Sequence, residues 1–582
     1  ETAVSLGLPK KSINGLPVVE MASFGRNVLN VNNSESVYEN KDENNGENRS
    51  IDIGKVFYMG ADDTAKVSLD IESLAMHTFV TGSTGTGKSN YIYNIVDKLK
   101  DKGIKFLIIE PAKGEYKEVF GSQENVHVYG TNIKKTPLLR LNPFSFPDDI
   151  HVLEHIDRLV EIFNACWPMY AAMPAVLKDA IEQAYVKKGW NLTLSECLFN
   201  TYPTFSDLLI ELHNVMDKSA YSADTKNDYI GSLVTRVKSL TNGINGQIFC
   251  SAFEIENHKL FDENVIADIS RVGSMETKAL IMGILIMKLQ EYRMAEAKGG
   301  NKPLRHITVL EEAHNILRKT SYAQGQESAN LQGKSVEMIT NSIAEMRTYG
   351  EGFIIADQSP CLMDEAVIRN TNTKIILRLP EGEDRELAGR SAALNENQID
   401  EIAKLPVGVA VIYQNNWLEA VLCHTEVYKN DKDHGYVYNM QNDFNVISKF
   451  FEQVFGISEK LDLREEDVDN IKNWIKNIRI GGHVKDILKF AIAGRKLSVS
   501  EQRKVAYDLF RGKEMAKILE KTSDENEAIS MVDNVITNTY NILNIEVRQR
   551  IRSLILEGIF SQENTERLQE RYDKVEFRGR CL

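Results

Sequence analysis

The sequence has no long apolar run and no regularly spaced cysteines. No segment approaches the roughly 18 to 20 consecutive apolar residues of a membrane-spanning helix, and the N-terminus lacks the basic-then-apolar layout of a secretory signal. The 6 cysteines show no C-x-x-C spacing, so neither a zinc site nor a disulfide framework is indicated. We therefore expect a cytoplasmic protein of a reducing compartment, without a membrane partner.

An excess of basic residues is also lacking. The chain has 69 Lys and Arg against 83 Asp and Glu, which gives a net charge of -14. This balance excludes a surface coated evenly with basic groups, although a local basic loop could still contact nucleic acid. With 582 residues, 42% of them hydrophobic, the chain is long enough for several domains. It begins with Glu1 rather than Met, so we expect further residues before it.

Short apolar runs alternate with helical patterns from Ile51 onward. Such near-continuous apolar strands, separated by helices, predict an α/β fold with a mostly parallel sheet covered on both faces. The runs predicted as strands are 77–82, 105–110, 125–130, 264–269, 306–312, 352–357, 374–379 and 408–413.

Other segments depart from this pattern and suggest the domain organisation. Residues 33–50 are polar and rich in Asn and Glu, which is typical of a linker. Apolar residues at helical spacing, including those of 501–521 and 564–574, predict helices outside the sheet. The predicted parts are an N-terminal segment (1–50), a first part of the core (51–147), a helical insertion (148–258), a second part of the core (259–430) and a helical C-terminal region (431–582).

One loop has the spacing of a nucleotide-phosphate binder. Residues 82–89 read G-S-T-G-T-G-K-S, between the apolar run 75–80 and a helical pattern at 90–100. Glycines let backbone N–H groups converge on phosphate oxygens, the lysine spans the terminal phosphates, and the serine hydroxyl ligates Mg²⁺. The predicted nucleotide-binding residues are Gly82, Ser83, Thr84, Gly85, Thr86, Gly87, Lys88, Ser89 and Asn90.

Two carboxylates follow the apolar run that begins at His306. A nucleotide hydrolase needs one acid to organise the Mg²⁺ shell and another to polarise the attacking water. We assign Glu311 to Mg²⁺, together with Ser89 and partly through water, and Glu312 to the general base. A solvated acid pair at a strand end is the alternative interpretation.

Gln358 and Arg347 are further catalytic candidates. Gln358 stands at the tip of the strand predicted at 352–357, where its amide can contact the γ-phosphate or hold the attacking water. Arg347 lies eleven positions earlier, at the end of the preceding helix, where it can stabilise transition-state charge in a neighbouring subunit. A surface ion pair for Arg347 and a structural role for Gln358 are the alternatives.

Taken together, these motifs resemble the HerA/FtsK group of P-loop ATPases, nearest to HerA-like ATPases of bacterial antiphage and conflict systems. The resemblance implies a RecA-like core that hydrolyses ATP with Mg²⁺ and assembles as a homo-oligomer, usually a hexameric ring with duplex DNA in its channel. It also implies that Arg347 is the arginine finger, with Arg378 as the second candidate. The motifs that carry it, within 51–430, are residues 81–89, 107–116, 308–317, 346–360 and 368–379.

The chain also departs from this group. A small β-barrel normally precedes the core, whereas residues 1–50 show few strand signals, so we do not expect a complete barrel. The helical insertion and the C-terminal region are additions to a minimal motor, and we expect them to offer docking surfaces for a companion protein.

The leading prediction is a DNA translocase or helicase-like ring motor that works with an effector nuclease in bacterial defence. A loop at 317–335 would contact DNA phosphates without reading bases, through Arg318, Lys319 and Lys334, unless it is a plain solvated loop. The alternative is a nucleotide-regulated scaffold that organises and activates a partner effector without translocating DNA. A secretion-type ATPase fits less well, because the sequence has no visible membrane anchor.

Overall fold

The structure is a computed structural model. It describes residues 10–11, 17–18, 50–197, 201–251, 254–297, 299–319, 327–429, 435–438, 446–457, 465–478, 480–521, 524–540, 542 and 544–561. The predicted linker at 33–49 and the helix predicted at 564–574 lie outside the described residues. A short antiparallel pair, β1 (Lys10–Lys11) and β2 (Pro17–Val18), precedes the main body.

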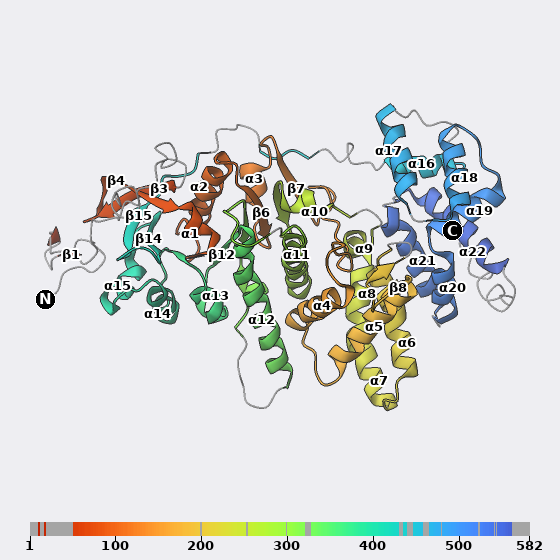
Figure 1. Ribbon diagram of the computed structural model, residues 1–582, viewed down its shortest axis with the longest axis horizontal. Coiled ribbons are helices and arrows are strands. Elements are labelled where there is room, and N and C mark those ends of the chain that lie inside the picture. The colour runs from red at the N-terminus through yellow and green to blue at the C-terminus, as the bar shows by residue number, and fades with distance from the viewer. Residues whose placement is uncertain are drawn as a thin grey trace.

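An 11-stranded sheet extends from the left side of the molecule to its middle in Figure 1. From β13 to β7 the strands run parallel, whereas β14, β15, β3 and β4 extend the other end in antiparallel pairs. Each run predicted as a strand overlaps one, which confirms the mostly parallel α/β fold. In sheet order the strands are β4 (Ala61–Asp70), β3 (Ser50–Tyr58), β15 (Val421–His424), β14 (Val409–Gln414), β13 (Thr373–Ile376), β5 (Thr78–Thr81), β12 (Glu351–Asp357), β11 (His306–Leu310), β6 (Lys105–Glu110), β10 (Asn264–Asp268) and β7 (Val126–Gly130).

Helices cover both faces of the sheet because its central strands are apolar on both sides. In β6, Leu107 and Ile109 join the hydrophobic core on one face, and Phe106 and Ile108 join the core on the other. The first core contains α11 (Met275–Ala295) and α12 (Glu327–Met346), and the second contains α1 (Ile71–Ala75), α2 (Lys88–Asp101) and α3 (Tyr116–Phe120). Three smaller helices are α13 (Glu365–Arg369), α14 (Gly382–Ser391) and α15 (Glu396–Glu401).

The chain between β7 and β10 is mainly helical. Its first helix packs against α11, so this part of the chain shares a core with one face of the sheet. The limits 148–258 of the insertion remain a prediction. Its elements are α4 (Val152–Cys166), α5 (Met173–Lys187), β8 (Trp190–Asn191), β9 (Glu196–Cys197), α6 (Phe205–Lys218), α7 (Ala223–Tyr229), a π-helix (Ile230–Val234), α8 (Thr235–Thr241), α9 (Gly243–Phe249) and α10 (Asn257–Phe261).

The described C-terminal residues form helices around a hydrophobic core of their own. The segment 501–521, predicted to be helical, forms two helices: Arg511 has a φ of 56°, a left-handed backbone that separates them. None of the helices in the described ranges is long and apolar enough to span a bilayer. The helices are α16 (Val446–Val454), α17 (Glu465–Asn477), α18 (Gly482–Ile492), α19 (Val499–Leu509), α20 (Gly512–Lys521), α21 (Glu525–Tyr540) and α22 (Ile545–Phe560).

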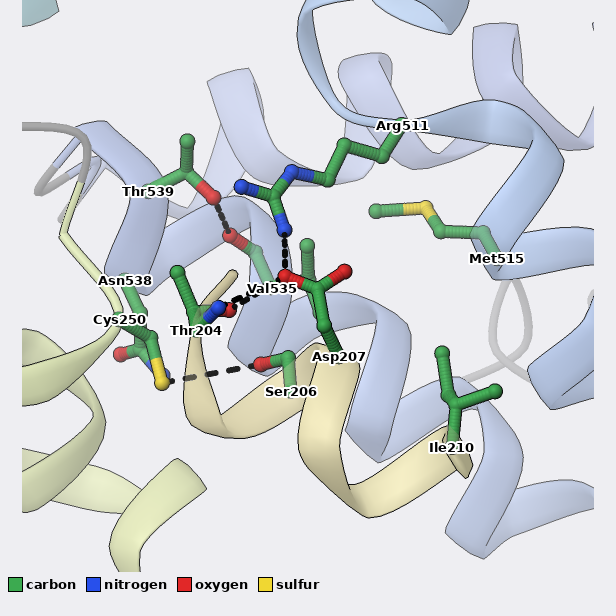
Figure 2. Close-up of a pocket in the computed structure, with 10 residues that line it drawn as sticks. All are labelled: Thr204, Ser206, Asp207, Ile210, Cys250, Arg511, Met515, Val535, Asn538 and Thr539. Carbon is green, nitrogen blue, oxygen red and sulfur yellow. Dashed lines mark hydrogen bonds and ion pairs between the residues drawn. The ribbon is translucent and has the colours of Figure 1, made fainter. Parts of the chain in front are cut away.

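Polar contacts join the C-terminal helices to the insertion. Figure 2 shows Arg511 directed at Asp207, with 2.8 Å between Arg511 Nη1 and Asp207 Oδ2. Lys188 Nζ lies 2.8 Å from the other oxygen of Asp207, and Asn538 Nδ2 donates to the carbonyl of Thr241 at 2.9 Å. Burial opposes ionisation of Asp207, but the charges of Arg511 and Lys188 hold the pKa of its carboxyl well below the usual range.

Candidate nucleotide-binding site

The glycine-rich loop connects β5 to α2, and its conformation requires glycine. Gly85 and Gly87 have φ values of 78° and 105°, in the left-handed region that disfavours residues with side chains. A Cβ atom on Gly82 would lie only 2.7 Å from Cβ of Leu377 and 2.8 Å from Oγ1 of Thr86. The motif therefore has the local structure that a phosphate loop needs.

The loop is also fixed by the strands beside it. Ser83 donates from its backbone N–H (3.0 Å) and its hydroxyl (3.1 Å) to the carbonyl of Arg378, just beyond β13. The carbonyl of Thr86 accepts from the N–H of Gly408 at 3.0 Å, just before β14. The Asn90 amide instead bonds to the main chain at residues 426 and 428, so its side chain holds this segment against α2.

Lys88 is buried at the start of α2 and has unused hydrogen-bonding capacity. Its Nζ has no hydrogen-bond partner among the residues that the structure describes, and it lies 3.9 Å from Oε2 of Glu311 and 3.8 Å from Oε1 of Glu312. An ammonium group has three donors, and leaving such donors unsatisfied in a buried position is costly. Phosphate oxygens would satisfy them, and the hydroxyl of Ser89, the next residue, could ligate a cation beside them.

Glu311 follows β11 directly, and its two carboxylate oxygens face different groups. The hydroxyl of Tyr116 donates to Oε1, while Oε2 faces Lys88. Burial raises the pKa of Glu311, and the positive charge of Lys88 counteracts this shift. The carboxyl group thus lies between a neutral donor and the phosphate-binding lysine.

Glu312 and Gln358 are connected to the phosphate loop by hydrogen bonds. Gln358 Nε2 donates to Glu312 Oε1 at 2.7 Å, and Gln358 Oε1 accepts from Thr84 Oγ1 at 2.8 Å. The amide uses its donor and its acceptor at once, so it links Glu312 to the phosphate loop. The carboxyl ends of adjacent parallel strands β5, β12 and β11 bring these residues together.

The backbone at Glu312 is strained, and a neighbouring pair stabilises it. Glu312 has a φ of 46°, which is uncommon for a residue with a side chain. Asp357 Oδ2 accepts from the backbone N–H of His314 at 2.8 Å and lies 2.9 Å from its Nδ1. The Asp357 carboxylate also raises the pKa of His314. This pair fixes the turn that carries the proposed base.

The two predicted arginines lie at opposite ends of their strands. Arg347 is exposed in the turn Arg347–Tyr349 before β12, and Gln358 follows that 7-residue strand. At about 3.3 Å per residue, roughly 20 Å separates Arg347 from the phosphate-loop edge. Arg378 lies at that edge, where its carbonyl binds Ser83.

The DNA-contact candidates are exposed, but they do not form one loop. Lys319 pairs with Glu365 at 3.0 Å, and Arg318 forms an isolated β-bridge with Met363. The prediction of a loop over 317–335 is wrong from Glu327 onward, because α12 begins there, with buried Val336, Ile339 and Ile343 at helical spacing. Lys334 is exposed on this helix, which reaches away from the sheet in Figure 1. Residues 320–326 lie outside the described residues.

Sequence reasoning missed Glu110 and Tyr116. The buried carboxyl group of Glu110 accepts the N–H groups of Glu115 and Tyr116, at 2.6 and 3.2 Å. Burial raises the pKa of Glu110 to about 8. In the sequence, residues 107–116 contribute to the family resemblance, which assigns no role to Glu110 or Tyr116. A carboxylate at a strand end before a glycine turn is the signal that would have identified Glu110.

Comparisons with known proteins agree with this geometry. Residues 51–294 match the family model described as the central domain of helicase HerA. A probable helicase of Methanocaldococcus jannaschii is 25% identical over 438 residues, which cover 70% of this chain and 76% of the relative. The DNA double-strand break repair helicase HerA of Sulfurisphaera tokodaii is 25% identical over 371 residues, covering 63% and 67% respectively.

A solved structure shares the fold. VirB4 of Thermoanaerobacter pseudethanolicus superposes with a TM-score of 0.51 at 16% identity, covering 65% of this chain and 97% of that one. Together these matches confirm the resemblance to the HerA/FtsK group that the motifs predict, and with it the RecA-like arrangement of the sheet.

Proposed function

We propose that this chain, which belongs to the HerA/FtsK type of P-loop ATPases, uses ATP hydrolysis to move duplex DNA. The observation that carries the proposal is the position of the buried Lys88 ammonium, which lies near Glu311 and Glu312 and has no hydrogen-bond partner in the described part of the chain. Relatives named as helicases support the DNA half of the proposal.

The residues at this edge of the sheet suit ATP with Mg²⁺. Lys88 and the loop N–H groups would hold the phosphates, while Ser89 and, partly through water, Glu311 would hold the metal ion. Bound Mg²⁺ neutralises phosphate charge as the γ-phosphate is transferred. Gln358 would orient the attacking water, and Glu312 Oε2, the oxygen that is not bonded to Gln358, would take its proton.

A ring of identical subunits, with a hexamer as the proposed size, fits the placement of Arg347. This arginine is exposed and too far from its own phosphate loop to contact a nucleotide there. In a neighbouring subunit it could contact the γ-phosphate, as an arginine finger supplied in trans does. Arg378 lies beside the loop of its own subunit, so a role within the subunit suits it better.

Contacts to DNA would come from the exposed basic residues after β11 and on α12. Arg318, Lys319 and Lys334 are exposed, and each can contact a phosphate without reading bases. The pairing of Lys319 with Glu365 lowers its net contribution, because DNA must compete with that carboxylate. Binding of this kind depends steeply on salt.

A companion effector, such as a nuclease in bacterial defence, is a further part of the proposal, together with a cytoplasmic location. The helices after β7 and the C-terminal helices supply surface that a minimal motor does not need. The alternative is a scaffold whose nucleotide state organises the effector without moving DNA. Glu311, where such sites more often have Asp, would suit the slow turnover of a scaffold.

Steady-state ATP turnover with and without linear duplex DNA, at low and at physiological salt, tests the proposal. A motor should be stimulated by DNA, and the stimulation should fade with salt. Turnover that is indifferent to DNA would refute the motor and favour the scaffold. Lys88→Ala, which should be inactive throughout, controls for contaminating ATPases.

The DNA surface can be tested with charge reversals. Lys319→Glu and Lys334→Glu together should weaken DNA stimulation, whereas Lys489→Glu should not. Lys489 is a matched control because it is 61% exposed and pairs with Asp486 at 2.9 Å, much as Lys319 is 51% exposed and pairs with Glu365. Unchanged stimulation in the double variant would remove these lysines from the proposal.

A further inference from the structure

Tyr116 is a buried tyrosine whose hydroxyl is directed at the nucleotide site. It is the first residue of α3, is 2% exposed, and donates a hydrogen bond to Glu311 Oε1. The ring of Tyr93 packs edge-on against the Tyr116 ring, with 5.0 Å between the ring centres. The hydroxyl is therefore held in place by packing as well as by its hydrogen bond.

The turn before Tyr116 is anchored independently. Lys113 and Gly114 have φ values of 65° and 73°, so the chain reverses sharply after β6. The carboxyl group of Glu110 accepts the N–H groups of Glu115 and Tyr116, which fixes the start of α3 to the end of β6. Because β6 and β11 are adjacent parallel strands, this anchor lies beside Glu311.

Glu311 needs such an anchor because a glutamate side chain has one more rotatable bond than aspartate. With Oε1 bound to Tyr116, Oε2 is left facing Lys88, where the phosphates and their cation would lie. We propose that Tyr116 is a positioning residue that aims Glu311 at the metal ion of the bound nucleotide. This inference rests on the proposed role of Glu311 in the Mg²⁺ shell.

The test measures the affinity for a fluorescent ATP analogue (mant-ATP), in Mg²⁺ and in EDTA, for the full chain and its variants. Partners of this kind around a metal ligand typically contribute about 10- to 100-fold to metal affinity or activity. Tyr116→Phe should weaken binding about 10-fold in Mg²⁺ and leave binding in EDTA within about twofold. Tyr185→Phe is the matched control, since Tyr185, on α5, is also buried and donates its hydroxyl to a neighbouring group, the carbonyl of Phe144.

A double-mutant cycle separates the inference from the role on which it rests. In a Glu311→Ala background, Tyr116→Phe should have no further effect on binding in Mg²⁺. An undiminished effect of Tyr116→Phe in that background, or no effect in the wild type, would overturn the positioning role. If Glu311→Ala alone leaves binding in Mg²⁺ unchanged, the proposed role of Glu311 is wrong, and the inference falls with it.

A second variant keeps the inference testable should Tyr116→Phe fail to fold, as judged by its melting temperature without nucleotide. Glu110→Gln keeps the shape of the side chain but weakens the anchor under Tyr116. It should reproduce the loss of affinity in Mg²⁺ with little change in EDTA. Equal losses under both conditions would mean that this turn binds phosphate or supports the fold, and would overturn the inference.

Discussion

Glu312→Gln should remove hydrolysis while leaving ATP binding intact. The amide keeps Oε1 as the acceptor for Gln358 Nε2, which now bonds at 2.7 Å, so the connection to Thr84 survives. What is lost is a group that can take a proton from water. Loss of a general base typically costs 10²- to 10⁴-fold in rate. We expect at least a hundredfold fall in kcat, which corresponds to about 2.7 kcal/mol of activation free energy.

Single-turnover hydrolysis of labelled ATP measures the chemical step, and equilibrium binding of ATP measures the affinity. Binding should be equal to that of the wild type or tighter, because a negative charge near the phosphates has been removed. Glu386→Gln is the control: Glu386 is exposed and forms an ion pair with Arg390 at 2.6 Å, so little change is expected. A rate within about threefold of wild type would refute the reasoning and move the base to Glu311.

Further predictions concern the contact between subunits of the ring, the ion pair between the insertion and the C-terminal helices, and the dependence of stability on pH. Arg347→Ala should abolish turnover, and mixing it with Lys88→Ala subunits should restore part of it; no recovery at any ratio would argue against a role across subunits. Asp207→Asn should lower the free energy of unfolding in urea by about 2–3 kcal/mol at pH 7, since it leaves Arg511 without its carboxylate partner. Because the pKa of Asp207 is lowered by folding, this difference should shrink as the pH falls below about 4, and equal stabilities at pH 7 would contradict it. The pKa of Glu110 is raised by folding, from 4.5 to about 8, so the folded state binds more protons and stability should fall as the pH rises across that range. Glu110→Gln should flatten the melting-temperature profile between these pH values, and parallel profiles would refute this assignment.

The sequence predicted the parallel strands well, because they are buried on both faces and therefore read as continuous apolar runs. In β6, each residue from Phe106 to Glu110 is buried. The antiparallel strands β3, β4 and β15 were missed. In β4, most residues from Ala61 to Lys66 are exposed and none is a large apolar residue, so that part of the strand has little apolar signal. A strand of this kind is recognised from the neighbouring strands with which it pairs, and a local sequence pattern does not show which strands those are.

In the site, too, features formed by residues close in the sequence were predictable, whereas contacts between residues far apart in the sequence were not. The phosphate loop was predictable because its glycines, Lys88 and Ser89 all lie within residues 82–89, and their spacing alone defines the geometry. The hydrogen bond from Tyr116 to Glu311 joins residues 195 positions apart. It exists because Leu310 pairs with Ile109 in the sheet, which brings the residues after both strands together. Without the strand order, the sequence offers no reason to connect them.

A buried positive charge lies near each end of the central strands, and the two differ in how well their hydrogen bonds are satisfied. This difference distinguishes a cation that stabilises the fold from one that is available to bind a ligand. At the end away from the phosphate loop, Arg293 is completely buried and bonds to Glu351 at 3.0 Å and to Asp262 at 2.7 Å. At the other end, the buried Lys88 ammonium forms no hydrogen bond with any described residue, and the carboxylates of Glu311 and Glu312 lie 3.9 and 3.8 Å from it. A fold that can satisfy one buried cation so completely does not need to leave another unsatisfied for stability. The unused donors of Lys88 are therefore best understood as kept for a ligand, and their cost is recovered when phosphate oxygens bind.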